Sequence, residues 1–151
     1  MKIALASDHG GFELKKDLFN WLKENNYDVI DLGNKEYDPL DDFPDYAEII
    51  SKSIIKGEAD RGILICGSGV GAAVAANKFK GIRASICHDI YSAHQGVEHD
   101  AMNILCLGAR VIGTLLAKDL VAAFINAKYL NEERLNRRLE KIKKFEDDFG
   151  N

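Results

Sequence analysis

A cysteine stands directly before a glycine-rich turn in the stretch LICGSGVGAAVAAN, which covers residues 64–77. Glycines let a turn bring its backbone N–H groups close to a bound molecule, and the start of a following helix adds more unpaired N–H groups. The turn after Cys66 consists of Gly67, Ser68, Gly69, Val70 and Gly71. This pattern predicts an anion-binding hollow. Because a helix N-terminus favours the thiolate form of a cysteine, Cys66 is a candidate base or nucleophile.

Other interpretations of the turn stay open on the residues alone. A nucleotide site is one of them, but the turn lacks the Lys-Ser/Thr pair of a P-loop and departs from the dinucleotide fingerprint in spacing. A second is that Cys66 is a small buried hydrophobic residue, which we expect for Cys87 and Cys106. A third is a phosphate-sensing module that binds without catalysis, although a binding loop needs no thiol at its edge.

Further polar residues follow predicted strands and would lie near the same turn. Asp8 and His9 come after the apolar run at 2–7, and Arg110 follows the run at 103–108. Ligands of open α/β sheets bind beyond the carboxyl ends of the strands, so these side chains are candidates for ligand contacts. The alternative is that Asp8 caps a helix while His9 faces solvent.

His99 lies at the other end of a predicted strand. It precedes the run at 103–108, so within one chain we expect it at the edge opposite Cys66. A functional His99 would therefore have to reach the site of a neighbouring subunit, and the alternative is a structural histidine. Arg134 and Arg138 lie four residues apart on one helix face, where two guanidinium groups can clamp a phosphate. Their alternative is a solvent-exposed face paired with glutamates.

Apolar runs alternate with amphipathic stretches along the chain. The predicted strands cover 2–7, 27–32, 61–66, 82–87 and 103–108, and the predicted helices cover 12–25, 44–57, 70–79, 90–99 and 112–127. This alternation predicts a three-layer αβα, Rossmann-like fold with a five-stranded parallel sheet. Residues 33–43 are acidic and turn-rich, which predicts a loop. The charged tail at 131–151 predicts a helix with a thin apolar stripe, which we expect to pack on a partner subunit.

Length and composition narrow the functional class. The 151 residues suggest a single domain, and the net charge of −4 gives no reason to expect nucleic acid or a membrane as partner. The three cysteines are widely spaced and no secretory-type segment opens the chain, so we expect reduced thiols in the cytoplasm. The histidines and cysteines show no spacing typical of a metal site.

Taken together and in order, several motifs resemble those of ribose-5-phosphate isomerase type B, a family that includes the galactose-6-phosphate isomerase subunits. They are SDHGGFELK, DFPDYA, GILICGSGVGAAVAANKFKGIRA, YSAHQGVEHDAMNILCLGARVIG and the paired tail arginines. The resemblance implies interconversion of D-ribose 5-phosphate and D-ribulose 5-phosphate without metal or cofactor. It also implies a homodimer or tetramer with its sites at the subunit interface.

The resemblance assigns roles residue by residue. Cys66 would move a proton between C2 and C1, while the N–H groups of Gly67 to Gly71 hold the enediolate and Ser68 assists at a hydroxyl. His99 would open the sugar ring. The remaining substrate contacts would come from Asp8, His9, Asp100, Arg110, Arg134 and Arg138.

The chain departs from the family pattern at several positions. Phe43 stands where the family commonly has Tyr, and Asp100 stands where it commonly has Asn. The tail carries one extra residue, so Arg137 is an alternative to Arg138. Isomerisation of a hexose 6-phosphate, such as galactose or allose 6-phosphate, is therefore an alternative activity.

Overall fold

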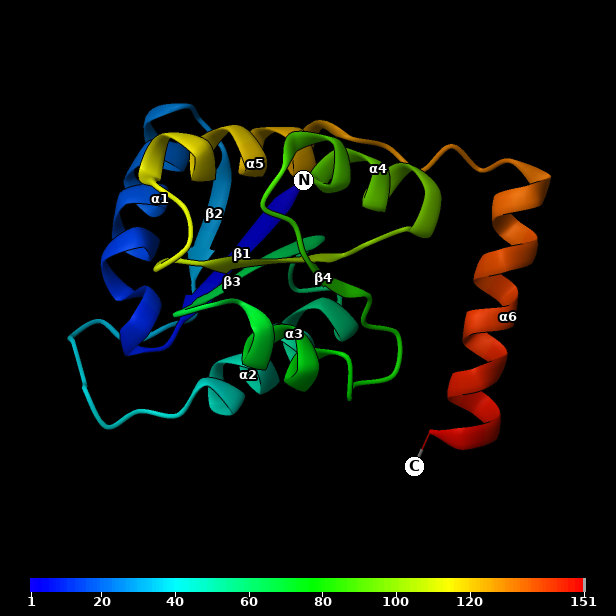
Figure 1. Ribbon diagram of the computed structural model, residues 1–151, viewed down its shortest axis with the longest axis horizontal. Helices are drawn as coiled ribbons and strands as arrows, with labels where there is room; N and C mark the ends of the chain where they lie inside the picture. The colour runs from blue at the N-terminus through cyan, green and yellow to red at the C-terminus, as the bar shows by residue number, and fades with distance from the viewer. Residues whose placement is uncertain (151) are drawn as a thin grey trace.

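The sheet of this protein is parallel throughout and carries helices on both faces (Figure 1). The computed structural model describes residues 1–150. The strands are β1 (Lys2–Ser7), β2 (Asp28–Asp31), β3 (Arg61–Cys66), β4 (Ala84–Ile86) and β5 (Ile104–Gly108). The helices are the 3-10 turn η1 (His9–Gly11), α1 (Phe12–Glu24), α2 (Phe43–Ile55), α3 (Val70–Ala76), α4 (Ile90–Asp100), α5 (Thr114–Asn126) and α6 (Glu133–Phe149). The predicted three-layer αβα, Rossmann-like fold is confirmed.

The strands lie in the order β2-β1-β3-β5-β4, so β1, β3 and β5 occupy the middle of the sheet. Their residues are buried at consecutive positions, as expected for strands covered on both faces. The register pairs Ser7 with Ile65 and Cys66 with Gly108. The carboxyl ends of these three strands therefore coincide at one edge of the sheet.

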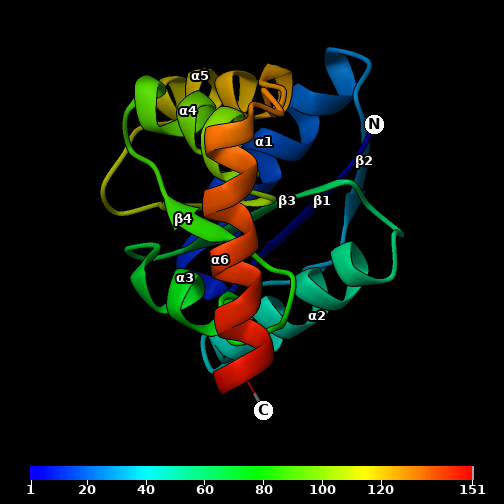
Figure 2. The same cartoon turned by 90° about the vertical axis from the view of Figure 1, so that its right-hand side faces the viewer.

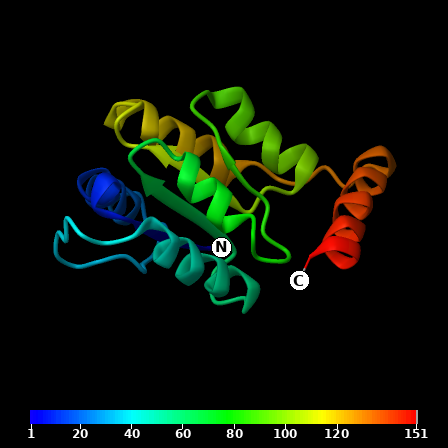
Figure 3. The same ribbon diagram turned by 60° about the horizontal axis from the view of Figure 1, so that its bottom comes forward.

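The sheet divides the buried apolar side chains into two clusters. Leu18 of α1 and Phe124 of α5 pack on one face, which α4 also covers. Ile50 of α2 and Ala76 of α3 pack on the other face, and the side chain of Cys66 belongs to this second cluster. Figure 3 shows the helices on either side of the sheet. Burying each large side chain contributes about 1.5–3 kcal/mol, so both layers hold the strand ends in register.

The sequence predicted α3 and β4 longer than they are. Asn77 ends α3 because its side-chain amide donates to Ala73 O at 2.9 Å and to Ala84 O at 2.7 Å. Its Oδ1 accepts the N–H of Ala84 at 2.9 Å. Gly81 then turns the chain with a φ of +86°. This side-chain bridge replaces further helical hydrogen bonds, so α3 stops at Ala76 and β4 begins only at Ala84.

Helix α6 stands beside the edge strand β4 and the end of α4 (Figure 2). The N–H of Leu130, just before α6, donates to Glu98 O at 3.0 Å. Leu135 is fully buried, and Glu146 accepts the N–H of Gly81 at 3.1 Å. The tail helix is thus tied to its own domain at both ends, and its packing on a partner subunit stays a prediction. Within residues 1–150, no helix is long and apolar enough to cross a membrane.

Candidate active site

Cys66 is the last residue of β3, and its sulfur is held by the turn that follows. The N–H of Gly69 donates to Cys66 Sγ at 3.1 Å. Gly69 has a φ of +83°, a conformation that glycine adopts readily, and this directs its N–H back toward the sulfur. Only 5% of Cys66 is exposed. The turn therefore places a hydrogen-bond donor where a thiolate would carry its charge.

The glycine turn is packed too closely for side chains at several positions. A Cβ on Gly71 would lie 2.8 Å from Cζ of Phe43, and a Cβ on Gly108 would lie 2.6 Å from the carbonyl oxygen of Ser68. Ser68 itself is exposed, and its Oγ accepts the N–H of Val70 at 3.2 Å. The glycines thus allow α2 and the end of β5 to fix the shape of the turn.

Arg110 lies beside Cys66 and the glycine turn, at the carboxyl edge of the sheet. Its N–H donates to Gly67 O at 2.9 Å, and the N–H of Ala109 donates to Cys66 O at 2.9 Å. The Arg110 side chain runs along Gly67, where a Cβ would lie 3.5 Å from its guanidinium. The turns after β3 and β5 are therefore hydrogen-bonded together, and an exposed cation lies beside the glycine turn.

Asp8 and His9 reach this edge from the end of β1. Asp8 Oδ1 accepts the N–H of Gly11 at 3.2 Å, so Asp8 is an N-cap, as the alternative interpretation proposed. Burial raises the pKa of the Asp8 carboxyl, while the neighbouring His9 opposes that shift. His9 Nδ1 lies 2.7 Å from Asp41 Oδ1, and this hydrogen bond raises the pKa of the imidazole. His9 is therefore paired rather than free in solvent.

Asp8, His9 and Asp41 offer ligand atoms within 4.8 Å of one another. A metal site would need these atoms free to face a common point. Asp8 Oδ1 is engaged in the N-cap, and Asp41 Oδ1 accepts from both the backbone and the side chain of His9. The geometry thus fits a hydrogen-bonded cluster better than a cation site.

His99 lies at the opposite edge of the sheet, as predicted from its place in the sequence, and Asp100 lies there with it. Both belong to the last turn of α4, which leads into the amino end of β5. Gln95 Nε2 lies 2.8 Å from His99 Nδ1, and Asp100 is exposed. The five residues of β5 span about 16 Å at about 3.3 Å per residue. One chain therefore does not bring His99 to its own Cys66.

The tail arginines lie near His99 and Asp100 and form a second group with them, at the amino edge of the sheet. Arg134 lies in the first turn of α6 and pairs through Nε with Glu132 at 2.7 Å. Arg138 follows one turn later, and it is exposed, as is Arg137. Since the N-terminal end of α6 adjoins the last turn of α4, these cations belong to the amino edge of the sheet.

The other two thiols match the structural interpretation. Cys87 and Cys106 are buried in separate clusters on the two faces of the sheet. Burial raises the pKa of both thiols, which keeps them protonated.

Sequence reasoning missed three residues that support the two groups. Asp41 lies in the acidic stretch 33–43, directly before the DFPDYA motif and outside it. His88 Nε2 accepts the N–H of Gly108 at 3.0 Å, and Arg83 Nε donates to Ala101 O at 2.8 Å. Arg83 lies inside the quoted GIRA segment, but its partner is 18 residues away and leaves no local pattern.

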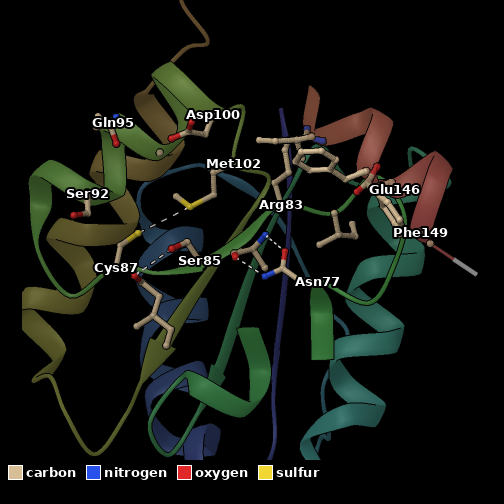
Figure 4. Close-up of a pocket in the computed structure, with 17 residues that line it drawn as sticks. Asn77, Arg83, Ser85, Cys87, Ser92, Gln95, Asp100, Met102, Glu146 and Phe149 are labelled. Carbon is tan, nitrogen blue, oxygen red and sulfur yellow. Dashed lines mark hydrogen bonds between the residues drawn. The ribbon is translucent and has the colours of Figure 1, made fainter. Parts of the chain in front are cut away.

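A cavity of about 680 Å³ lies between α6 and the body of the domain (Figure 4). Its walls include Arg83, Cys87, Asp100, Met102 and Phe149. Cys66 does not line it. A smaller hollow of about 290 Å³ lies at the carboxyl edge and includes His9 and Ala109. The larger cavity is therefore a groove beside the amino-edge group and not the place of the thiol.

Comparison with known proteins decides the family. A model of the family described as Ribose/Galactose Isomerase matches residues 3–142. The chain belongs to the ribose/galactose isomerase family. The isomerase of this family from Escherichia coli (strain K12), ribose-5-phosphate isomerase B, is 44% identical over 141 residues, which cover 93% of each chain.

Solved structures of ribose/galactose isomerases agree. Ribose-5-phosphate isomerase B of Clostridium thermocellum superposes with a TM-score of 0.94 at 42% identity and 99% coverage of both chains. The Mycoplasma genitalium enzyme, solved with bound ribulose-5-phosphate, gives a TM-score of 0.89 at 38% identity and 97% coverage of both chains. The family inferred from the motifs and the predicted fold are both confirmed.

Proposed function

We propose that this isomerase interconverts D-ribose 5-phosphate and D-ribulose 5-phosphate by proton transfer through an enediolate, with Cys66 as the base. The observation that carries the proposal is the contact between Cys66 Sγ and the N–H of Gly69 at 3.1 Å. The reaction needs a placed base and a means of holding developing negative charge. The end of β3 offers both within a few residues.

The chemistry follows from this arrangement. The thiolate of Cys66 would take the proton from C2 of the open-chain aldose, which moves the charge onto O1 of the enediolate. It would then return the proton to C1, while the hydroxyl proton of O2 passes to O1 and C2 becomes the carbonyl carbon. The first turn of α3 has N–H groups without intrahelical partners, which can receive that oxygen. Donors of this kind are worth about 3–4 kcal/mol each in the best-studied enzyme. Ser68 is exposed in the turn, and its hydroxyl would assist at a hydroxyl of the substrate.

The second part of the proposal is a site shared between two subunits of a homodimer, or of a tetramer built from such dimers. Cys66 and His99 lie at opposite edges of the sheet in one chain. Ring opening by His99 therefore requires that His99 come from the partner subunit. Arg134 and Arg138 would arrive with it and join Arg110 at the phosphate, with Asp8 and His9 contacting the sugar phosphate from the first chain.

The direct test is formation of ribulose 5-phosphate from ribose 5-phosphate by the purified protein with a chelator present. We expect turnover that the chelator does not reduce. Galactose 6-phosphate and allose 6-phosphate measured in parallel test the hexose alternative, which faster turnover of either sugar would favour. Binding of ribose 5-phosphate without any product would contradict the proposal and favour a binding module.

A further inference from the structure

The segment between β2 and α2 carries a carboxylate that holds one of the candidate substrate-binding side chains. Asp41 Oδ1 accepts the backbone N–H of His9 at 2.9 Å and lies 2.7 Å from its Nδ1. The Asp41 side chain is only 8% exposed, whereas that of His9 is 31% exposed. One oxygen thus fixes both the backbone and the ring of His9 from a segment 32 residues away.

Asp41 is itself held in place by a chain of hydrogen bonds that ends at the buried side chain of Lys15. Asn34 Nδ2 donates to Asp41 Oδ2 at 3.1 Å, so both carboxylate oxygens are engaged. Asn34 O accepts from Lys15 Nζ at 2.7 Å, and Lys15 Nζ lies 2.9 Å from Asp31. The Lys15 side chain is 3% exposed. A largely buried ion pair between α1 and β2 therefore anchors the acidic loop that carries Asp41.

We propose that Asp41 is a positioning residue, which holds the His9 ring with Nδ1 tied to the protein and Nε2 presented to the anionic group of the sugar phosphate. This rests on the proposed function, in which His9 contacts the substrate. Because a carboxylate accepts only from N–H, Nδ1 carries a proton in the paired ring. Nε2 is then the nitrogen that gains or loses a proton, and only its protonated form donates to a phosphate.

The charged groups around His9 favour the protonated, cationic form of its imidazole. The hydrogen bond to Asp41 is the main cause that raises the pKa of His9, and Asp8 acts in the same direction. Glu13 and Asp17 of α1 line the adjoining hollow with His9. Tyr37 places its ring edge-on, 6.4 Å from the imidazole centroid.

Two more groups complete the surroundings of this pair. Burial and the Asp41 carboxylate raise the pKa of the Tyr46 phenol, so Tyr46 stays neutral behind Asp41. Arg110 at the adjoining turn is the nearby cation, and it lies along Gly67. Without Asp41, His9 would lose its proton at a lower pH, and a phosphate would meet a neutral ring.

The test compares Asp41→Asn with the matched control Asp42→Asn. Asp42 is the next residue, is exposed, and makes no side-chain cap hydrogen bond to α2. The control thus removes the same formal charge from the same segment without touching His9. Asp41→Glu is the conservative variant, and we expect it to restore most of the wild-type behaviour.

Kinetics give the first measurement. We expect Asp41→Asn to raise the KM for ribose 5-phosphate about tenfold at pH 8 and to leave kcat within about twofold, because a charge-assisted hydrogen bond to phosphate is lost. Below about pH 6, an ordinary histidine is already protonated, so the KM ratio of variant to wild type should approach one. The titration of the substrate phosphate cancels in this ratio. A ratio that is independent of pH, or equal to that of Asp42→Asn, would overturn the proposal.

NMR titration of the His9 imidazole gives a readout that does not depend on turnover. We expect the pKa of His9 to fall in Asp41→Asn and to stay unchanged in Asp42→Asn, with His9→Asn identifying the signal. Added inorganic phosphate should shift this signal in the wild type and less in Asp41→Asn at pH 8. An unchanged His9 titration in Asp41→Asn would refute the positioning role, whereas absence of isomerase activity alone would refute only the proposed function.

Discussion

At the carboxyl edge of the sheet, Cys66 and its glycine turn follow directly from a buried strand, whereas at the amino edge the end of α4, which carries His99, is held by contacts between distant segments. The first group depends on backbone conformation within a few residues, such as the φ of +83° at Gly69. The second depends on α4, α6 and the turn before β4 meeting one another. The difference shows that one half of the proposed site depends mainly on local backbone conformation and the other half on tertiary packing.

The two groups also differ in what they could do alone. The carboxyl edge combines the thiol, the N–H donors and Arg110. The amino edge offers the half-buried His99 and the exposed tail arginines. Proton transfer at carbon is proposed for the first and ring opening for the second, and both supply cations to the phosphate. Neither is complete without the other, which is why the proposed site spans two subunits.

The largest expected effect is at the carboxyl edge. Cys66→Ala should lower kcat for ribose 5-phosphate by about 10²–10⁴-fold, because it removes the general base and leaves the turn intact. Circular dichroism and thermal unfolding should show an unchanged fold. Cys87→Ala is the matched control, since that thiol is buried in the other cluster, and it should retain activity. Full activity in Cys66→Ala would show that another group is the base.

Mixing variants tests whether the two edges belong to different subunits. Cys66→Ala and His99→Asn should each be nearly inactive, but their co-expressed mixture should regain about a quarter of wild-type activity, because half of the symmetric dimers are then mixed and have one intact site. Cys66→Ala mixed with Asp8→Ala, a second carboxyl-edge variant, should regain nothing. Equal recovery in both mixtures, or recovery in neither, would contradict a site formed by Cys66 of one subunit and His99 of the other.

A smaller effect is expected where Arg83 supports the amino edge. Arg83 donates to Ala101 O at 2.8 Å and to Gly81 O at 3.2 Å, and Ala101 ends α4 with a φ of +50°. Arg83→Met removes the side-chain donor to Ala101 O, whereas Gly81 O still accepts from Asn103 Nδ2 at 2.8 Å. The variant should lower the free energy of unfolding by about 1–3 kcal/mol in urea titration. Lys78→Met, at an exposed position, should change it little. Equal stability of both variants would mean that Arg83 does not hold this end of α4.

Most of the fold could be read from periodicity, but the segment from α3 to β4 could not. Asn77 and Ala84 exchange hydrogen bonds across seven residues and shorten both elements, and no local propensity signals that exchange. Among the site residues, Cys66 and Asp8 were found from their places after buried strands. Asp41 was missed because its role exists only once the 33–43 stretch folds back onto His9.

The amino-acid sequence by itself determined the succession of strands and helices along the chain, the parallel sheet and the position of Cys66 before a glycine turn. The reason is that the spacing of apolar residues and the placement of glycines act on the backbone over short distances. Tertiary structure alone decided that His9 is paired with Asp41, that Arg83 holds the end of α4, and that α6 is tied to the turn at Gly81. These contacts join residues 18 to 65 positions apart. Their geometry is set by how the layers pack, a property that no short stretch of the chain contains.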